Sequence, residues 1–334
     1  MLRQARLPPA RTLPPMLTYS VATLVGFVLL MWGADRFVVG AASTARNMGL
    51  SPLLIGLTLV GMATSGPEIF VSVAASLRGD PALAAGNAVG SNIANIGLVL
   101  GMTALVMPIS VRSVTLRREM PTLLAVTLIL TMILINLRLG RVEGTLLLVT
   151  LVLVLYWLVV IGSRSGESDP IALDYASEIP GDVPMRRAIV WLVVGLLTLL
   201  AGANLLVWGA QKLAIAFNVS ELVIGLTVVA IGTSLPELAV SLVSAFKGEH
   251  DMAIGNIIGS NLFNSLAVMG IAGLIHPAVF DRELLTAHLP VMIGMTLALF
   301  LMTYNFGGNS RIGRIEGVML VGAFICYHVW ILTR

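Results

Sequence analysis

Charged side chains are scarce in this chain. Asp, Glu, Lys and Arg make up only 11% of its 334 residues, whereas a soluble domain carries about 25%. Hydrophobic residues account for 57%, and the mean hydropathy is +0.96. A chain with so little charge cannot keep most of its surface in water, which excludes a soluble globular protein and a disordered one. The composition predicts a multi-pass membrane protein embedded in a lipid bilayer.

Cysteine is almost missing as well. The single residue, Cys326, excludes an intrachain disulfide and a thiolate metal site. The 20 Lys and Arg residues barely outnumber the 17 Asp and Glu residues, and they stand singly between apolar runs. Isolated bases of this kind are typical of membrane-edge anchors. We therefore expect no nucleic-acid partner.

Apolar runs fill most of the sequence. A bilayer core needs about 20 apolar residues per helix, and breaks at charges, Pro, Gly and Asn leave ten runs near that length. The runs cover residues 17–44, 51–77, 82–106, 119–137, 143–163, 187–217, 220–246, 252–275, 284–304 and 315–332. No alternating strand pattern accompanies them. The sequence predicts an all-α membrane protein with ten transmembrane helices.

The second half of the chain repeats the first at an offset of 169 residues. The register holds over three segments, with 55–58 falling on 224–227, 64–68 on 233–237, and 86–92 on 255–261. Five runs, an odd number, separate the copies, so the second copy crosses the membrane in the opposite direction. Inverted repeats with interrupted helices are typical of secondary transporters, whose binding site lies near the bilayer midplane between the repeats.

The repeat also defines the domain organisation. One sizeable hydrophilic stretch separates the two sets of five runs. We expect a first five-helix repeat at 17–163, a linker loop at 164–186 and a second five-helix repeat at 187–334. Residues 1–16 contain three arginines and four prolines and are expected to form a disordered tail.

Two acidic residues stand inside apolar runs and coincide in the repeat. They are Glu68 and Glu237. A carboxylate at mid-bilayer costs roughly 2.5–3.5 kcal/mol on insertion scales, so each needs a partner or a purpose. Each follows a proline, Pro67 or Pro236, and proline leaves the carbonyl four residues earlier without its helical donor. The two acids are therefore the leading functional candidates.

Polar residues form matching stripes around these acids. Helical spacing places one stripe beside each glutamate and another on the following run. The first stripes are Gly61, Thr64 and Ser65, and Ala230, Thr233 and Ser234; the second are Asn87, Ser91 and Asn95, and Asn256, Ser260 and Asn264. Together they predict an all-oxygen pocket with two carboxylates. Ca²⁺ and Na⁺ suit such ligands, whereas Zn²⁺ and Cu⁺ do not.

Structural roles compete with functional ones at other positions. Small residues mark close helix contacts, and we expect packing to explain the repeated glycines Gly33, Gly40, Gly202 and Gly209. The intramembrane base Arg36 has Leu205 as its counterpart, so symmetry argues against it as a partner of the glutamates. Whether Asp35 and its counterpart Asn204 line an access route stays open.

With these motifs the chain resembles the sodium/calcium exchanger branch of the cation/calcium antiporter superfamily over essentially its whole length. The most specific matches are the segments 64–68 and 90–95 with their copies 233–237 and 259–264. The resemblance implies a core of the second, third, seventh and eighth helices, across which the first and sixth slide. It also implies a prokaryotic inner (plasma) membrane protein with both termini outside and a cytoplasmic linker.

The resemblance assigns ions to residues. It implies that Glu68 and Glu237 bind Ca²⁺ with help from the backbone carbonyls of Thr64 and Thr233. It implies that Na⁺ ions are held by Ser65, Ser91, Asn95, Ser234, Ser260 and Asn264, with the carbonyls of Gly61 and Ala230. No cofactor is expected beyond the transported Ca²⁺ and Na⁺, and the site is expected to be complete in a monomer.

Two positions depart from the family pattern. Some members carry Asp where this chain has Asn264, so one ionisable group is missing here. Gly61 stands opposite Ala230 in the repeat, which matters little because the ligand there is a carbonyl. With two carboxylates, two Na⁺ balance the site and three leave it at +1. We hypothesise that Asn264 lowers the Na⁺:Ca²⁺ ratio or changes ion selectivity.

Secondary antiport is the function that these features favour, with Ca²⁺ leaving the cytoplasm as Na⁺ enters by alternating access. Exchange of Ca²⁺ for H⁺ stays open, because glutamates in a low-dielectric pocket can carry protons. A cation channel is a third possibility, although channel filters are normally rings from several subunits. The membrane runs contain no paired aspartates and no repeat-matched Ser and His, so we do not expect an enzyme.

Overall fold

The computed structural model describes residues 14–49, 56–77, 79, 81–111, 116–165, 183–216, 230–303 and 310–333. Within those ranges eight helices are long and apolar enough to cross a membrane, or nine if the bent pair Thr58–Thr64 and Gly66–Leu77 forms one span. The expected spans 51–77 and 220–246 both begin outside the described residues, so the count of ten stays a prediction. The all-helical membrane architecture is confirmed.

The helices follow the apolar runs because backbone groups in lipid must be satisfied within the segment itself. The first half comprises α1 (Pro14–Asn47), η1 (Gly56–Val60), α3 (Gly61–Thr64), α4 (Gly66–Leu77), α5 (Pro81–Ala94), η2 (Asn95–Leu100), α6 (Gly101–Val106), α7 (Leu116–Ile133), η3 (Leu134–Asn136) and α8 (Arg141–Ser165). The second half comprises α10 (Met185–Ala216), α12 (Ala230–Thr233), α13 (Leu235–Phe246), α14 (His250–Phe263), η5 (Asn264–Val268), α15 (Met269–Ile275), η6 (Leu284–His288), α16 (Leu289–Thr303) and α17 (Arg314–Leu332).

Two expected segments fall mainly outside the described residues. One is the tail at 1–16, of which only residues 14–16 are described, as the start of α1. The other is the linker at 164–186, where α8 ends at Ser165 and α10 begins at Met185.

Two short strand pairs join the halves. The strands are β1 (Ile109–Val111), β2 (Arg138–Leu139), β3 (Ala278–Val279) and β4 (Ser310–Ile312). β1 pairs antiparallel with β4, and β2 pairs antiparallel with β3. In the repeat, β3 corresponds to β1 and β4 corresponds to β2. Applying the repeat to the β1–β4 pair therefore gives the β3–β2 pair, and the reverse also holds. The packing of α6 on α17 and of α15 on α8 is exchanged in the same way, as a two-fold pseudo-symmetry requires.

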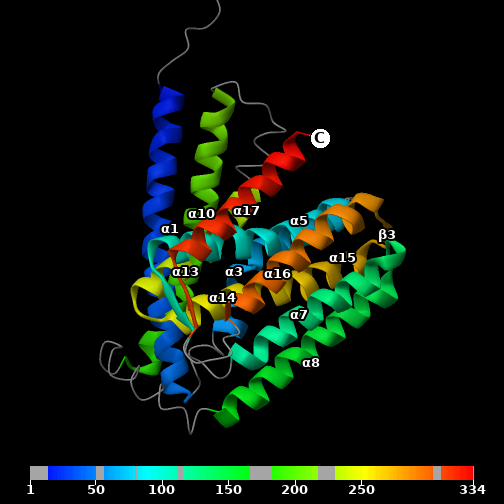
Figure 1. The fold of residues 1–334 in the computed structure, drawn as a ribbon. Helices are drawn as coiled ribbons and strands as arrows, with labels where there is room; N and C mark the ends of the chain where they lie inside the picture. Colours follow the sequence, from blue (N-terminus) through cyan, green and yellow to red (C-terminus); the bar gives the residue numbers. More distant parts are fainter. Residues whose placement is uncertain are drawn as a thin grey trace, which may run out of the picture.

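The helices α1 and α10 form a tight antiparallel pair, which we call the α1–α10 pair; Figure 1 shows it on one side of the remaining helices. Glycines let the two backbones touch. A Cβ on Gly33 would lie 2.4 Å from the Leu199 backbone nitrogen, and one on Gly195 would lie 2.3 Å from that of Phe37. Gly40, Gly202 and Gly209 make backbone contacts of the same kind. The packing role expected of the repeated glycines is confirmed.

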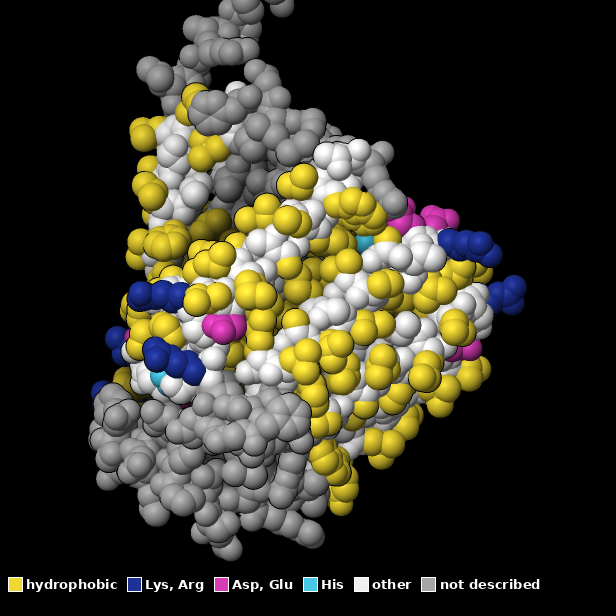
Figure 2. Space-filling view, viewed as in Figure 1, with side chains coloured by type: hydrophobic (Ala, Val, Ile, Leu, Met, Phe, Trp, Pro, Cys, Tyr) yellow, Lys and Arg dark blue, Asp and Glu magenta, His cyan; other side chains and the backbone are white. Residues whose placement is uncertain are grey.

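The most deeply buried spans are Pro81–Val106 and His250–Ile275, with 72% and 89% of their apolar windows buried against 39% or less in the other long spans. They contain α5, η2 and α6, and α14, η5 and α15, which together we call the core. Hydrophobic side chains cover the outer face of the described helices, with charged ones mainly toward helix ends (Figure 2). A surface of this kind faces lipid, and the polar residues of the repeat lie inside.

Candidate cation site

Each candidate glutamate follows a break in its helix. Ser65 ends α3 with φ −77° and ψ 5°, and Ser234 precedes α13 with φ −88° and ψ 2°. The first break bends the span by 51°. The proline after each serine cannot donate to the carbonyl four residues earlier. Glu68 and Glu237 thus sit in the first turns of α4 and α13, where the helix dipole stabilises negative charge.

The next helices contain a second irregularity, directly at the expected asparagine ligands. The π-helical segments η2 and η5 begin at Asn95 and Asn264. A π turn replaces bonds four residues apart by bonds five residues apart, and such turns occur frequently at functional sites. Both repeats therefore distort the backbone at the same two places.

The two glutamates are fully buried. Neither forms an ion pair with any described base. Both carboxylate oxygens of Glu68 and the Oε2 atom of Glu237 lack a hydrogen-bond partner in the described part of the chain. Two buried acids with three unmet acceptor atoms require cations or protons to be stable.

Hydroxyl groups from both repeats surround Glu237. The side chains of Ser65 and Ser260 each donate to its Oε1 atom at 3.5 Å. The Oγ1 atom of Thr64 lies 3.3 Å from the Oγ atom of Ser260. The structure therefore brings together four of the expected residues, two from the first repeat and two from the second.

Asn256 fixes the backbone around Glu237. Its Nδ2 atom donates to the Glu237 carbonyl at 3.2 Å and to the Ser241 hydroxyl at 3.0 Å. Its Oδ1 atom accepts the Thr64 hydroxyl at 3.0 Å. All four residues are buried, so this network connects α3, α13 and α14 without water.

A close backbone contact seals this side. A Cβ on Gly61 would lie 2.9 Å from the Cα atom of Gly259, so only glycine lets α3 approach α14 this far. The Oγ atom of Ser260 also lies 3.5 Å from the Gly61 carbonyl oxygen. That carbonyl was an expected ion ligand, and it lies among the other expected ion ligands around Glu237.

The side of Glu68 is more open. Asn87 donates to the Glu68 carbonyl at 3.1 Å, as Asn256 does to that of Glu237. Beside this bond lies a cavity of about 80 Å³ lined by the expected residues Ser91 and Thr233 and by Asn87. Its other lining residues are Gly86, Gly90, Ala94, Ile231, Phe324 and His328. The cavity provides space for ions or water beside Asn87, whose amide donates to the Glu68 carbonyl.

Asparagines add further oxygen atoms to the core. Asn95 donates to the Oδ1 atom of Asn261 at 3.1 Å, and Asn92 donates to the Ser265 hydroxyl at 2.8 Å. The Oδ1 atoms of Asn92, Asn95 and Asn264 have no hydrogen-bond partner among the described residues. Three buried amide oxygens are thus available to a cation.

Some expected residues are placed less directly. Ser234 is buried, and its hydroxyl has no partner in the described ranges. Ala230 begins α12, and its side chain lies outside the described residues. The sequence analysis did not name Asn92 and Asn261 as ligands, although both belong to the repeated Gly-Ser-Asn segment at the same offset of 169.

The donor set is composed of oxygen alone. Two carboxylates meet hydroxyl, amide and carbonyl oxygens, and the described residues contain no group of three or more His, Cys, Asp or Glu side chains that would hold a metal ion. Such a set fits hard cations such as Ca²⁺ and Na⁺ better than softer transition metals.

The sequence matches the family described as sodium/calcium exchanger protein over residues 18–160 and 187–333. It is 51% identical over 312 residues to the putative antiporter CaxA of Alkalimonas amylolytica, which covers 93% of this chain and 98% of that protein. It is 39% identical over 318 residues to the inner membrane protein YrbG of Escherichia coli (strain K12), covering 95% and 96%. It is 30% identical over 339 residues to the sodium/calcium exchanger MaX1 of Methanosarcina acetivorans, covering 92% and 96%.

Solved structures give the same picture. The fold is similar to that of the sodium-calcium exchanger NCX_Mj soaked with 10 mM Na⁺ and 10 mM Sr²⁺, with a TM-score of 0.80, 34% identity, and coverage of 93% of this chain and 97% of that one. The same protein soaked with zero Na⁺ and Ca²⁺ also gives a TM-score of 0.80, at 33% identity with 93% and 98% covered.

Proposed function

Since this chain belongs to the sodium/calcium exchanger family, a family of cation/Ca²⁺ antiporters in the membrane, we propose that it exchanges Na⁺ for Ca²⁺ by alternating access. Ca²⁺ leaves the cytoplasm, and Na⁺ entry drives it. The observation that carries this proposal is the pair of fully buried glutamates with unmet carboxylate oxygens, each supplied by one repeat.

Charge explains why the ions exchange. Glu68 and Glu237 together carry −2, which one Ca²⁺ or two Na⁺ neutralise. Because the same carboxylates serve both ions, the two cargoes compete for one site. Without either cargo the buried negative pair would be uncompensated in a low dielectric, so the empty protein changes conformation less readily than the loaded one. Exchange of Ca²⁺ for Na⁺ follows when each conformational change requires a bound ion.

Asn264 sets the proposed stoichiometry. It is fully buried, and neither of its amide atoms has a hydrogen-bond partner in the described chain. A neutral amide supplies a ligand oxygen without adding charge. We infer that two Na⁺ exchange for each Ca²⁺, without net charge movement. Replacing Asn264 by Asp adds a third carboxylate and should make the exchange electrogenic.

The proposal extends to topology and assembly. We propose a functional monomer, because the two repeats together supply both carboxylates and the hydroxyls around Glu237. As in the resembling family, we place both termini outside and the linker 164–186 in the cytoplasm of a prokaryotic plasma membrane. A cysteine introduced at Thr333, the exposed last described residue, should react with an impermeant thiol reagent on intact spheroplasts.

Ion flux in proteoliposomes tests the function. Uptake of ⁴⁵Ca²⁺ is measured under separate Na⁺, K⁺ and proton gradients, with and without a clamped membrane potential. We expect a Na⁺ gradient alone to drive uptake, with no response to potential, and Asn264→Asp to acquire such a response. Uptake driven only by a proton gradient would identify Ca²⁺/H⁺ exchange instead. Single-channel currents without counter-transport would identify a channel.

A further inference from the structure

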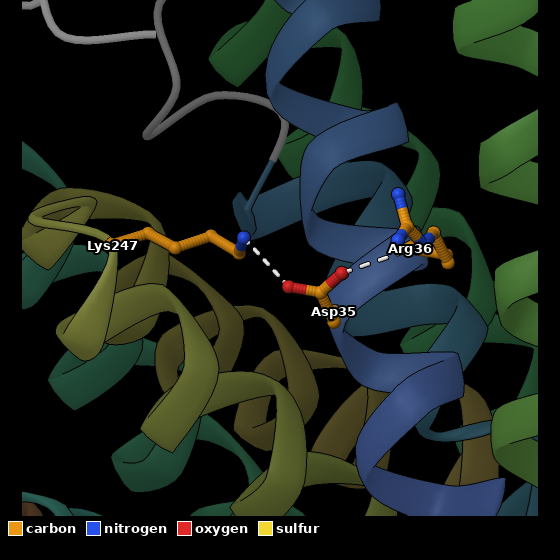
Figure 3. Close-up of polar contacts among 3 residues, drawn as sticks. All are labelled: Asp35, Arg36 and Lys247. Carbon is orange, nitrogen blue, oxygen red and sulfur yellow. Dashed lines mark ion pairs between the residues drawn. The ribbon is translucent and has the colours of Figure 1, made fainter. Parts of the chain in front are cut away.

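Among the described residues, one ion pair joins the α1–α10 pair to the rest of the molecule. The Nζ atom of Lys247, directly after α13, lies 2.7 Å from the Oδ1 atom of Asp35 on α1 (Figure 3). Arg36 approaches the other oxygen of Asp35 at 3.5 Å. The guanidinium of Arg36 lies over the rings of Trp32 on α1 and Trp191 on α10. Of these two bases, Lys247 is the one that reaches Asp35 from the α13 side.

This connection lies at a place where the two repeats pack differently in the described chain. α1 packs along α13, whereas the counterpart contact, α10 on α4, is at most slight in the described chain. The contacts of α4 with α5, of α6 with α17 and of the strand pairs all have matching copies. An inverted repeat reaches its alternative state when the two halves exchange arrangements. The asymmetry of α1 and α10 therefore marks one of those two states.

The sequence makes the two states electrostatically unequal. At the offset of 169, Asn204 is the counterpart of Asp35, and Arg78 is the counterpart of Lys247. Arg78 lies outside the described residues. Asn204 donates to the Leu200 carbonyl of its own helix at 2.8 Å. When the halves exchange, a base therefore meets a neutral amide where it now meets a carboxylate.

We propose that the Asp35–Lys247 ion pair is a latch that holds the α1–α10 pair against α13 and favours the observed state over the exchanged one. The latch rests on the proposed alternating access. Both side chains are about one third exposed, at 36% and 33%, and pairs of this kind contribute modestly. Removing the pair should raise the ratio of exchanged to observed state about two- to fivefold.

Distances between spin labels measure this ratio without any transport. Cys326, the only cysteine, is replaced by Ser, and labels are attached at Leu24→Cys on α1 and Leu128→Cys on α7, both exposed. A second pair, Leu83→Cys on α5 with Leu128→Cys, serves as the control because neither helix belongs to the α1–α10 pair. Double electron–electron resonance, a pulsed EPR method, then gives the fraction of molecules at each distance between the labels.

Four variants test the latch. Asp35→Asn should increase the population of the exchanged state. The charge reversal D35K with K247D should bring the ratio back to that of the parent protein. Asn204→Asp should build the second latch and also increase the exchanged population, so that the combination with Asp35→Asn changes the ratio by about tenfold. An unchanged ratio in both D35N and N204D, with the control distance intact, would overturn the proposal. The latch and the proposed function can fail separately. If the ratio is unchanged but these variants still exchange ⁴⁵Ca²⁺, only the latch fails. If the ratio shifts but the parent protein shows no ⁴⁵Ca²⁺ exchange, only the proposed function fails.

Discussion

The two halves of the cation site use the same sequence motif and have different surroundings. Around Glu237, hydroxyls of Ser65 and Ser260 reach the carboxylate, and α3 touches α14. Around Glu68, both carboxylate oxygens lack a hydrogen-bond partner in the described chain, and a cavity of about 80 Å³ lies next to Asn87. The difference resides in how the helices are arranged and hardly at all in the residues supplied.

This comparison shows that the residues of the two halves can be the same while the packing of their helices differs. Each repeat contributes one acid, one helix break and one π turn, so the two repeats offer the same kinds of oxygen ligand. We call the Glu237 half, where hydroxyls reach the carboxylate and α3 touches α14, the closed half, and the Glu68 half the open half. The helices also pack differently, since α1 packs along α13 whereas the contact of α10 with α4 is at most slight in the described ranges. An exchanger needs equal chemistry and unequal access, because the same ligands must face the two sides in turn.

The largest expected effect tests whether the halves are chemically equal. Glu68→Gln and Glu237→Gln should each reduce ⁴⁵Ca²⁺ exchange by about 30-fold or more, since losing one member of a buried charged contact costs about 2–5 kcal/mol. Glu143→Gln and Glu316→Gln are matched controls, because these repeat-related acids accept only backbone donors at helix starts, at 2.9 Å. Strong loss in one glutamate variant alone would break the equality.

A second comparison measures the difference in packing. Asn256→Ala removes three buried hydrogen bonds and should destabilise the protein by about 2–4 kcal/mol. Asn87→Ala removes one bond at a half-buried position and should cost about 1 kcal/mol. Thermal unfolding of the ion-free protein in detergent measures both. Equal losses would show that the closed half is no better packed than the open half.

A third comparison uses one methyl group on each side. Gly61→Ala introduces a Cβ 2.9 Å from the Gly259 backbone and should cost about 1–3 kcal/mol through overpacking. Gly90→Ala places its Cβ where no atom lies within 4 Å, so the melting temperature should change little. If both variants melt alike, the close approach of α3 to α14 is not a determinant of the closed half.

Much of this could be predicted from the sequence. The offset of 169 predicted that Glu68 and Glu237 belong to one site, and the polar stripes predicted Thr64, Ser65 and Ser260 around them. Periodicity and composition suffice for such features because burying a charge in lipid is so costly.

Other features could not be predicted, for physical reasons. The π turns at Asn95 and Asn264 depend on packing between core helices, and no local pattern announces them. The bonds of Asn261 and Asn92 depend on which amide atom faces which neighbour. The role of Asp35 stayed open because its partner, Lys247, comes from the other half of the chain. Above all, identical motifs predict identical surroundings, so the closed and open halves appear only in the three-dimensional arrangement.

The most direct test of the central claim is calorimetric titration of the purified protein with Ca²⁺ at increasing Na⁺. We predict one Ca²⁺ bound per chain, an apparent affinity that falls as Na⁺ competes for the same carboxylates, and no binding in Glu68→Gln or Glu237→Gln. Ca²⁺ binding that persists in both variants, or that is indifferent to Na⁺, would contradict the account.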